Sequence, residues 1–325
     1  MNLLQYINKY FYDDSPLAKI ENYVQKDEPF FTAQLLVRVY YFFLLYSSIT
    51  FFSSWDFSIG PQTDISFILP ISWLKYAGFP LGMIIIRLSF IVTSLLASIA
   101  PQFRLVRILS FVALLEFVSL YFSVLQLDVD WYTMLLVSFL LIFLPDKWGK
   151  INLFPVIARQ KFLLVFWGCQ AIVALTYSMA GLGKLVGGVS QLLAGESFML
   201  EMKAGALQVA NRLIVTNSTS LLGPWGVDHY IFLWPFFIGT IYLLLFSFVA
   251  VFRPNIHRLW GFGLILFHIG NYLFINIGFS AHIFLLSLLF LASPFAPSIV
   301  SWREILDDLP ILGFALRLFK NKYAS

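Results

Sequence analysis

Four residues of different chemistry recur at helical spacing in the segment QAIVALTYSMAGLGKL, residues 170–185. Gln170, Tyr177, Gly181 and Lys184 are separated by seven, four and three residues, so a helix places all four on one face. An amide, a phenol and an amine would then face the same way, with a gap in the side-chain surface at the glycine. Such a face could have a functional role, because polar groups are costly at membrane depth. The alternative is that Lys184 only extends to the lipid headgroups, as lysines at span ends commonly do.

Two histidines in an apolar stretch form a second candidate site. His268 and His282 are fourteen residues apart, and the sequence NIGFS between them makes a continuous helix doubtful. With two asparagines nearby, these residues indicate either a polar cavity or histidines that are hydrogen-bonded in the core. Because no carboxylate or cysteine accompanies them, we predict no metal site. The other two histidines, His229 and His257, lie at predicted span ends and are expected to be exposed.

The composition places these residues in a membrane protein. Of 325 residues, 60% are apolar and 12% are charged, against roughly 25% charged in soluble domains. The apolar runs are continuous and lack the alternation of membrane β-strands, so the predicted fold is all-α and polytopic. Membrane lipid is the expected partner, and no basic cluster indicates a nucleic acid. Eight spans are expected, of which the fourth and eighth are short: 32–52, 81–99, 106–126, 131–145, 163–183, 229–251, 257–276 and 279–294.

Charged residues predict how these spans are oriented. With Met1 in the cytoplasm, fifteen lysines and arginines fall on the cytoplasmic side and four on the opposite side, which agrees with the positive-inside rule. Both termini are therefore expected in the cytoplasm, with Lys184 and the polar connection 186–227 on the outer side. The predicted divisions are a cytoplasmic or interfacial segment, a transmembrane domain and a cytoplasmic tail: 1–31, 32–296 and 297–325.

Two segments outside the spans carry expectations of their own. Residues 65–80 contain two prolines and Lys75, and we predict that they are interfacial or re-entrant. In the C-terminal tail, Glu304, Asp307 and Asp308 are expected to lie on a solvated turn of helix.

What the sequence lacks narrows the possible functions. There is no P-loop, no GxGxxG before a helix, no GxSxG and no HExxH motif. The single cysteine, Cys169, excludes an internal disulfide and any multi-cysteine metal site. The N-terminal residues have no uninterrupted apolar region and no small-residue cleavage site, so we do not expect a signal peptide.

The segment LTYSMAGLGKL, residues 175–185, resembles the vitamin K-dependent γ-carboxylase and its relatives, the horizontally transferred transmembrane (HTTM) family. The family signature is an apolar helix with an upstream glutamine, then a tyrosine, then an A-G-x-x-K-L turn. A second segment, FHIGNYLFINIGFSAHIFLLSLLFL at residues 267–291, is similar to the family's histidine-containing span, Gly-Phe break and final span. The resemblance covers most of residues 32–294 in layout, but only these two segments are motif-like.

The resemblance implies a chemistry for these residues. Lys184 stands where the carboxylases have a base that deprotonates a vitamin K-type hydroquinone, the implied cofactor. Oxygen then converts the hydroquinone to an epoxide, and the strongly basic intermediate removes a γ-proton from a glutamate that captures carbon dioxide. This is a carboxylation of the lyase class, and the implied location is a bacterial inner membrane. The other implied site residues are two catalytic histidines and three cofactor contacts: His268, His282, Gln170, Tyr177 and Gly181.

The sequence also departs from the family pattern. No tryptophan follows the K-L pair in VGGVSQLLAGESF, and Gly183 stands where the vertebrate-type enzymes have a second lysine. We also expect no large extracytoplasmic β-rich domain of the kind that binds propeptides. The expected substrate is therefore a peptide or small molecule that is lipid-soluble or delivered by a partner. The alternative is a non-catalytic membrane subunit that assists maturation or export of a secreted peptide. A transporter ranks last, because no internal repeat is evident.

Overall fold

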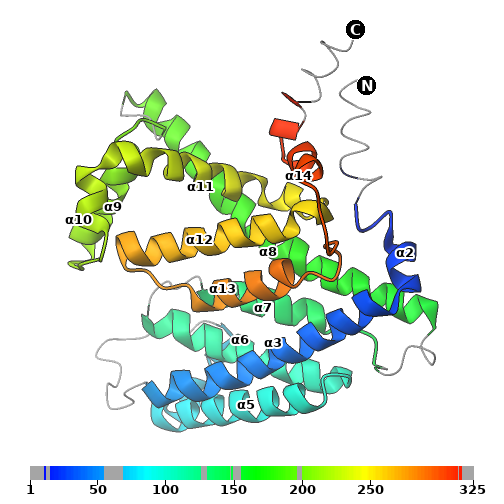
Figure 1. Cartoon of the computed structure of the whole chain (residues 1–325). Coiled ribbons are helices and arrows are strands. Elements are labelled where there is room, and N and C mark those ends of the chain that lie inside the picture. Colours follow the sequence, from blue (N-terminus) through cyan, green and yellow to red (C-terminus); the bar gives the residue numbers. More distant parts are fainter. Residues whose placement is uncertain are drawn as a thin grey trace. The chain divides into compact units, whose positions relative to one another are not determined.

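The computed structural model describes residues 11, 15–54, 69–125, 130–146, 148, 155–195, 200–313 and 315–316. Every regular element within these ranges is helical, which confirms the all-α prediction (Figure 1). Six helices are long and apolar enough to cross a membrane, so the chain is a multi-pass membrane protein. They are α3 (Asp27–Ser54), α5 (Phe79–Ile99), α6 (Arg104–Leu125), α8 (Val156–Leu193), α11 (Tyr230–Ala250) and α12 (His257–Ile275).

Two further apolar helices occupy the positions of the predicted fourth and eighth spans. They are α7 (Asp130–Leu141) and α13 (Ser280–Leu286), the second of which runs on into the π-helical turn η5 (Ser287–Leu291). Both are short, as the sequence predicts. About 20 residues are needed to cross a hydrocarbon core, so each of these segments is shorter than a full straight span.

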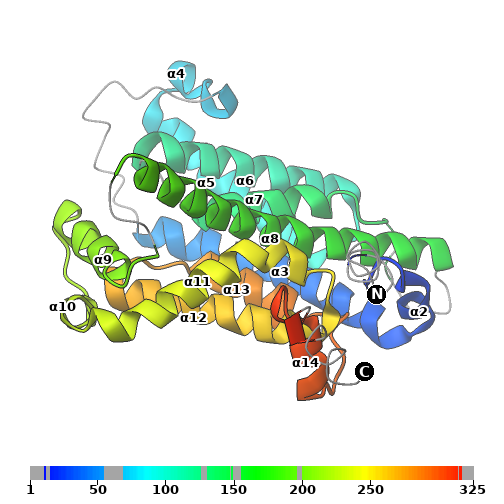
Figure 2. The same ribbon diagram turned by 90° about the horizontal axis from the view of Figure 1, so that it is seen from above.

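The chain forms two compact units, with a boundary between Cys169 and Gln170 inside α8. The first unit, residues 20–169, contains α2 (Ile20–Gln25) and the helices up to the first part of α8. In it, α3 packs along α5, α5 along α6 and α6 along α7 (Figure 2). Its core includes a stacked aromatic pair, Phe90 on α5 and Phe117 on α6, with ring centres 4.9 Å apart.

The connection before α5 contains two short helices in the part that the structure describes, η2 (Leu69–Ile71) and α4 (Leu74–Ala77). Leu69 and Tyr76 project from it and are 88% and 93% exposed. Gly78 follows with a φ of 79°, a conformation that glycine adopts without steric cost, and the chain turns there into α5.

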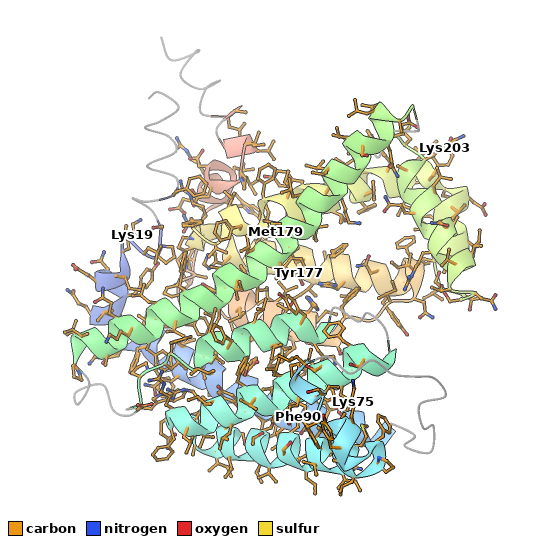
Figure 3. The ribbon with its side chains drawn as sticks, turned by 180° about the vertical axis from the view of Figure 1, so that it is seen from behind. Lys19, Lys75, Phe90, Tyr177, Met179 and Lys203 are labelled. Atoms are coloured by element: carbon orange, nitrogen blue, oxygen red, sulfur yellow. The ribbon has the colours of Figure 1, made fainter. Side chains whose placement is uncertain are left out.

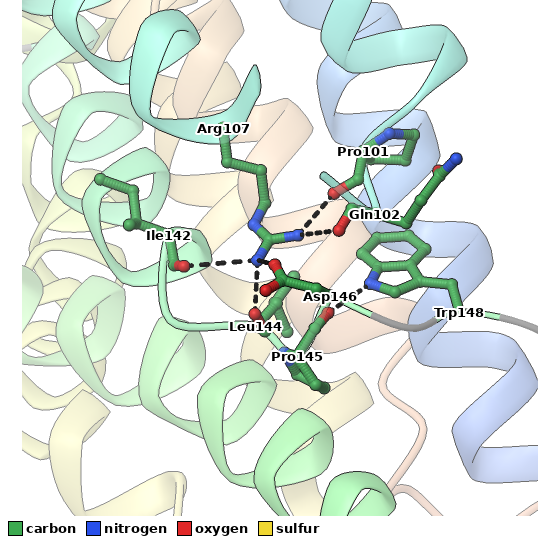
Figure 4. Close-up of polar contacts among 8 residues, drawn as sticks. All are labelled: Pro101, Gln102, Arg107, Ile142, Leu144, Pro145, Asp146 and Trp148. Carbon is green, nitrogen blue, oxygen red and sulfur yellow. Dashed lines mark hydrogen bonds and ion pairs between the residues drawn. The ribbon is translucent and has the colours of Figure 1, made fainter. Parts of the chain in front are cut away.

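A buried arginine fixes the turns at one end of the first unit (Figure 4). Arg107 is fully buried, and its guanidinium contacts four backbone carbonyls and one carboxylate, those of Pro101, Gln102, Ile142, Leu144 and Asp146. The last two of these carbonyls lie just beyond α7, where helix carbonyls have no partner within the helix. The arginine therefore joins the turn before α6 to the end of α7.

The second unit is made of residues 170–325 with the described residues before Ile20. Here α9 and α10 pack together and both contact α12. The Leu222 N–H donates to the Leu273 carbonyl, and the Ser220 hydroxyl donates to the Phe274 carbonyl, both at 2.8 Å.

Most of the described part of 186–227, predicted as a polar connection, is helical. The additional elements are α9 (Ala204–Val215), α10 (Gly223–Asp228), η4 (Pro254–Ile256) and α14 (Trp302–Asp308).

Helix α8 is longer than the predicted span 163–183, and this corrects the sequence interpretation. It runs for 38 residues, which at 1.5 Å per residue is about 57 Å, nearly twice the thickness of a hydrocarbon core. The expected A-G-x-x-K-L turn is absent from this helix, because Gly181, Gly183 and Lys184 are all helical. Figure 3 marks Tyr177 and Met179 on α8; the first is buried and the second is exposed.

The acidic residues of α14 differ in their surroundings. Glu304 is exposed and forms a capping box with Ser301, as expected for a solvated first turn. Asp308 is only 7% exposed, which corrects the prediction that it is solvated. Its carboxylate accepts hydrogen bonds from Arg253 at 3.3 Å and from Asn255 at 2.9 Å, so it anchors α14 next to η4.

Candidate functional site

The structure brings together three of the six predicted site residues, Tyr177 on α8, His268 on α12 and His282 on α13. Tyr177 Oη and His268 Nε2 share a hydrogen bond of 2.6 Å. The ring centre of His282 lies 5.3 Å from that of His268 and 5.8 Å from that of Tyr177. All three side chains are at most 7% exposed. We refer to these three residues as the Tyr–His cluster.

Phenylalanine rings pack against the Tyr–His cluster. The ring centre of Phe279 is 4.8 Å from that of His268 and 5.7 Å from that of His282. Phe267 lies against His268 at 5.0 Å. These rings keep water from the Tyr177–His268 hydrogen bond, and a low local dielectric strengthens it.

The break between α12 and α13 decides where the second histidine lies. Helix α12 ends at Ile275, and Asn276 follows in the left-handed conformation with a φ of 53°. Asparagine is among the few residues that adopt this conformation readily, so it acts as the C-cap. The doubt about a continuous helix is therefore confirmed. His268 and His282 belong to different helices and meet through tertiary packing.

Gln170 takes part in a separate polar network, away from the phenol of Tyr177. Its Nε2 donates to the Leu289 carbonyl at 2.5 Å and to the Ser293 hydroxyl at 2.9 Å. The Ser293 hydroxyl is also 3.0 Å from His257 Nδ1, and His257 Nε2 is 3.0 Å from the Val251 carbonyl. Gln170 therefore ties α8 to the end of η5 and to the start of α12.

The prediction that His257 is exposed is wrong, because its side chain is 0% exposed. A carbonyl can only accept, so His257 Nε2 carries the hydrogen that it donates to Val251. In the neutral ring, Nδ1 then accepts from the Ser293 hydroxyl. His229 is exposed as expected, and it stacks on Trp225 with ring centres 5.0 Å apart.

Gly181 marks a close approach of α8 to α11. A Cβ atom at Gly181 would lie 2.6 Å from the Leu245 backbone nitrogen, a distance that real Cβ atoms do not reach. One turn earlier, the Ser178 hydroxyl donates to the Leu245 carbonyl at 3.0 Å and accepts from the Phe248 N–H at 2.8 Å. Small residues permit such contacts between membrane helices. The space beside Gly181, expected to be a gap in the side-chain surface, is filled by the backbone of α11.

Lys184 lies one turn beyond Gly181 on α8 and is half-buried. It follows Tyr177 by seven residues, a rise of about 10 Å along the helix. A Cβ atom at the neighbouring Gly183 would meet no atom within 4 Å, so this side of the helix is open. Lys184 is therefore placed between a packed side of α8 and an open one.

Possible metal ligands of the described residues are scattered or few. Within the described ranges, no three histidine, cysteine, aspartate or glutamate residues lie together as a metal site would require. Cys169 is buried and has no disulfide partner. Tyrosine is a further possible ligand type, and the Tyr–His cluster contains one.

Sequence reasoning missed Ser293, His257 and Phe279 as neighbours of the candidate residues. The helical spacing of His257 and His268, eleven residues apart, was a usable signal, because it places both on one face of α12. Nothing in the sequence marked Ser293, because Gln170 and His257, its partners in this network, lie more than thirty positions away. Comparison of the chain with family models, with curated proteins and with solved structures gives no match.

Proposed function

We propose that the chain is a membrane enzyme that oxidises a lipid-soluble hydroquinone, with Lys184 as general base, in the manner of the vitamin K-dependent γ-carboxylase. One observation carries the proposal. Tyr177 and His268 share a buried hydrogen bond of 2.6 Å in apolar helices, beside His282 and on the helix that also carries Lys184. Ionisable and polar groups are costly at membrane depth and are usually retained there for function.

The proposed chemistry starts with the transfer of a proton from one quinol hydroxyl to the neutral amine of Lys184. The bound quinol would supply the rest of the chemistry: its oxidation by oxygen to an epoxide and water would generate a base strong enough to remove a γ-proton from a glutamate of a peptide or small substrate, which would then bond to carbon dioxide. Tyr177, His268 and His282 would hold the quinol oxygens by hydrogen bonds.

Gln170 and Gly181 contribute to this proposal through the position of α8. Gln170 anchors the helix to Leu289 and Ser293, and Gly181 admits the backbone of α11 at Leu245. Both contacts are on the side of α8 that carries Tyr177, so they fix the rotation of the helix and thereby the direction of Lys184. With both termini in the cytoplasm of a bacterial inner membrane, Lys184 would act at the outer side.

The proposal is tested by oxygen-dependent epoxidation of vitamin K-type hydroquinone by the purified chain in lipid. Three proteins are compared: wild type, Lys184→Ala and the matched control Lys161→Ala, whose lysine is exposed on the same helix. Loss of a general base costs roughly 10²- to 10⁴-fold in rate. We expect Lys184→Ala to lose activity to that extent and Lys161→Ala to keep it.

Two outcomes would contradict the proposal. If Lys184→Ala forms as much epoxide as wild type, Lys184 is not the general base. Absence of epoxide from a wild-type protein that is monodisperse in lipid would remove quinol oxidation. The chain would then be better described as a non-catalytic subunit that assists maturation or export of a secreted peptide.

A further inference from the structure

We infer that the Tyr–His cluster binds one first-row transition-metal ion, with Tyr177, His268 and His282 as its three protein ligands. This inference goes beyond quinol oxidation and does not depend on Lys184. The sequence predicts no metal because no carboxylate or cysteine accompanies the two histidines. The structure supplies a third ligand of another type, the phenol of Tyr177, from a different helix.

The three rings are spaced as rings around a single ion would be. Their centres are 5.3 Å apart for His268 and His282, 5.7 Å for Tyr177 and His268, and 5.8 Å for Tyr177 and His282. Two imidazoles on one tetrahedral ion have ring centres about 5 Å apart, because each nitrogen lies about 2 Å from the metal. A phenolate on the same ion places its ring about 6 Å from each imidazole, since its oxygen lies outside the ring. The cluster meets both separations.

Two of the donor atoms already face each other. Tyr177 Oη and His268 Nε2 are 2.6 Å apart, whereas neighbouring donors on one ion are about 3 Å apart. A shift of less than about 1 Å in either side chain would therefore admit the ion. The ion takes the place of the proton that the phenol and the imidazole share.

The exchange balances in bonds and protons, and a divalent ion adds one positive charge to the cluster. The phenol O–H bond breaks, its proton leaves to bulk water, and an oxygen–metal bond forms. Both imidazoles bind as neutral rings through a lone pair, so only one proton is released. Metal affinity must then rise with pH, because ligand deprotonation and metal binding are linked.

The donor set and its surroundings decide which ions fit. Imidazole favours zinc, copper, iron and nickel, and divalent affinities rise from manganese to copper. Three protein ligands leave a fourth position open, as in catalytic rather than structural sites. The Phe267 and Phe279 rings restrict water around His268, which suits an ion that is reached by a small lipid-soluble ligand.

The inference is tested with copper(II) alone as the probe, on the purified full-length chain in detergent after removal of any affinity tag. Copper content is measured by mass spectrometry, binding by titration, and the phenolate bond by a visible charge-transfer band. His268→Gln, His282→Gln and Tyr177→Phe are compared with wild type. His229→Gln is the matched control, because His229 is exposed. A gel-filtration profile confirms that each variant is folded.

We expect one copper ion per chain in the wild type, in Lys184→Ala and in His229→Gln. Each histidine variant should lose more than the roughly 10- to 100-fold in affinity that removal of an outer-shell partner costs. Tyr177→Phe, which keeps the ring, should lose the visible band. Absence of copper from the folded wild type, or a band that persists in all three cluster variants, would overturn the inference. Neither result would bear on Lys184 as the base, which the epoxidation comparison tests separately. A copper ion on the cluster would replace the hydrogen bonds from Tyr177, His268 and His282 to the quinol.

Discussion

Gln170 on α8 and Leu289 are joined by a 2.5 Å hydrogen bond in the middle of the π-helical turn η5 that continues α13. In a regular α-helix the Leu289 carbonyl would accept from the N–H of Ser293. Here that N–H points to the Phe290 carbonyl instead. The Gln170 amide donates to the Leu289 carbonyl in place of that N–H, so a side chain from another helix completes the hydrogen bonding of the π turn.

Gln170→Leu should therefore lower the free energy of unfolding by about 1–3 kcal/mol, because it leaves a buried carbonyl and the Ser293 hydroxyl without this donor. Thermal unfolding of the purified protein in detergent measures the effect. The control is Gln191→Leu, since Gln191 is exposed on the same helix. Equal melting temperatures for the two variants would show that the buried network adds nothing to stability.

Arg107→Met should destabilise the first unit by at least about 1–3 kcal/mol, the cost of leaving one buried polar group without its hydrogen-bond donor. Its carbonyl partners and the carboxylate of Asp146 would lose their donor (Figure 4). Arg107→Lys should restore little, because the lysine ammonium lacks the planar fork of N–H donors with which the guanidinium reaches several carbonyls at once. Arg104→Met serves as the control, since Arg104 is exposed. The prediction is contradicted if Arg107→Met and Arg104→Met unfold at the same temperature.

Gly181→Ala and Gly183→Ala should have opposite effects although they are two residues apart. A Cβ atom at Gly181 meets the backbone of Leu245 at 2.6 Å, so α8 and α11 must separate; overpacking of this kind costs about 1–3 kcal/mol. A Cβ atom at Gly183 meets nothing within 4 Å, and the better helix propensity of alanine is worth up to about 1 kcal/mol. The melting temperatures of both variants measure these effects. A higher melting temperature for Gly181→Ala than for wild type would contradict the close approach of α8 to α11.

Stability of the α14 capping box should depend on pH. The Glu304 carboxylate accepts hydrogen bonds from the Ser301 N–H and hydroxyl, which lower its pKa from the ordinary value of 4.5. A folded-state pKa below the unfolded one means that the stabilisation is complete above about pH 4.5. It is lost as the pH falls through the folded-state pKa.

Hydrogen exchange of α14 amides, corrected for intrinsic rates, measures this loss at successive pH values. Protection should fall on acidification in wild type, and Glu304→Gln should remove this component. Asp308 is the other carboxylate that anchors α14, so the variant separates the contribution of Glu304 from the rest. An identical pH dependence in Glu304→Gln would exclude Glu304 as its source.

Much of the fold could be predicted because apolar length alone identifies a membrane helix. The positions of α7 and α13, and their shortness, followed from the extent of their apolar runs. The end of α8 could not be predicted in this way. Gly181 and Gly183 normally weaken a helix, and only the packing of α11 against Gly181 shows why the helix continues.

The candidate site was predicted in part. The spacing on α8 singled out Tyr177 without predicting its burial, and the two histidines were recognised as polar groups at membrane depth. That Tyr177 and His268 touch depends on how α8 and α12 pack, which no local pattern encodes. Arg107 was missed for a related reason: four of its partners are backbone carbonyls, which every residue possesses, so nothing in the sequence distinguishes them.

The Ser178 hydroxyl, which bonds both the Leu245 carbonyl and the Phe248 N–H, has a consequence for assembly during synthesis. Ser178 leaves the ribosome 70 residues before Phe248, so its hydroxyl is already present when α11 enters the bilayer. Gln170 must wait longer for its partner than Ser178, because Leu289 is synthesised 119 residues after it. Until the last apolar segment arrives, the amide of Gln170 lacks this carbonyl, and a nascent chain that stops short of Leu289 is left with this polar group to satisfy.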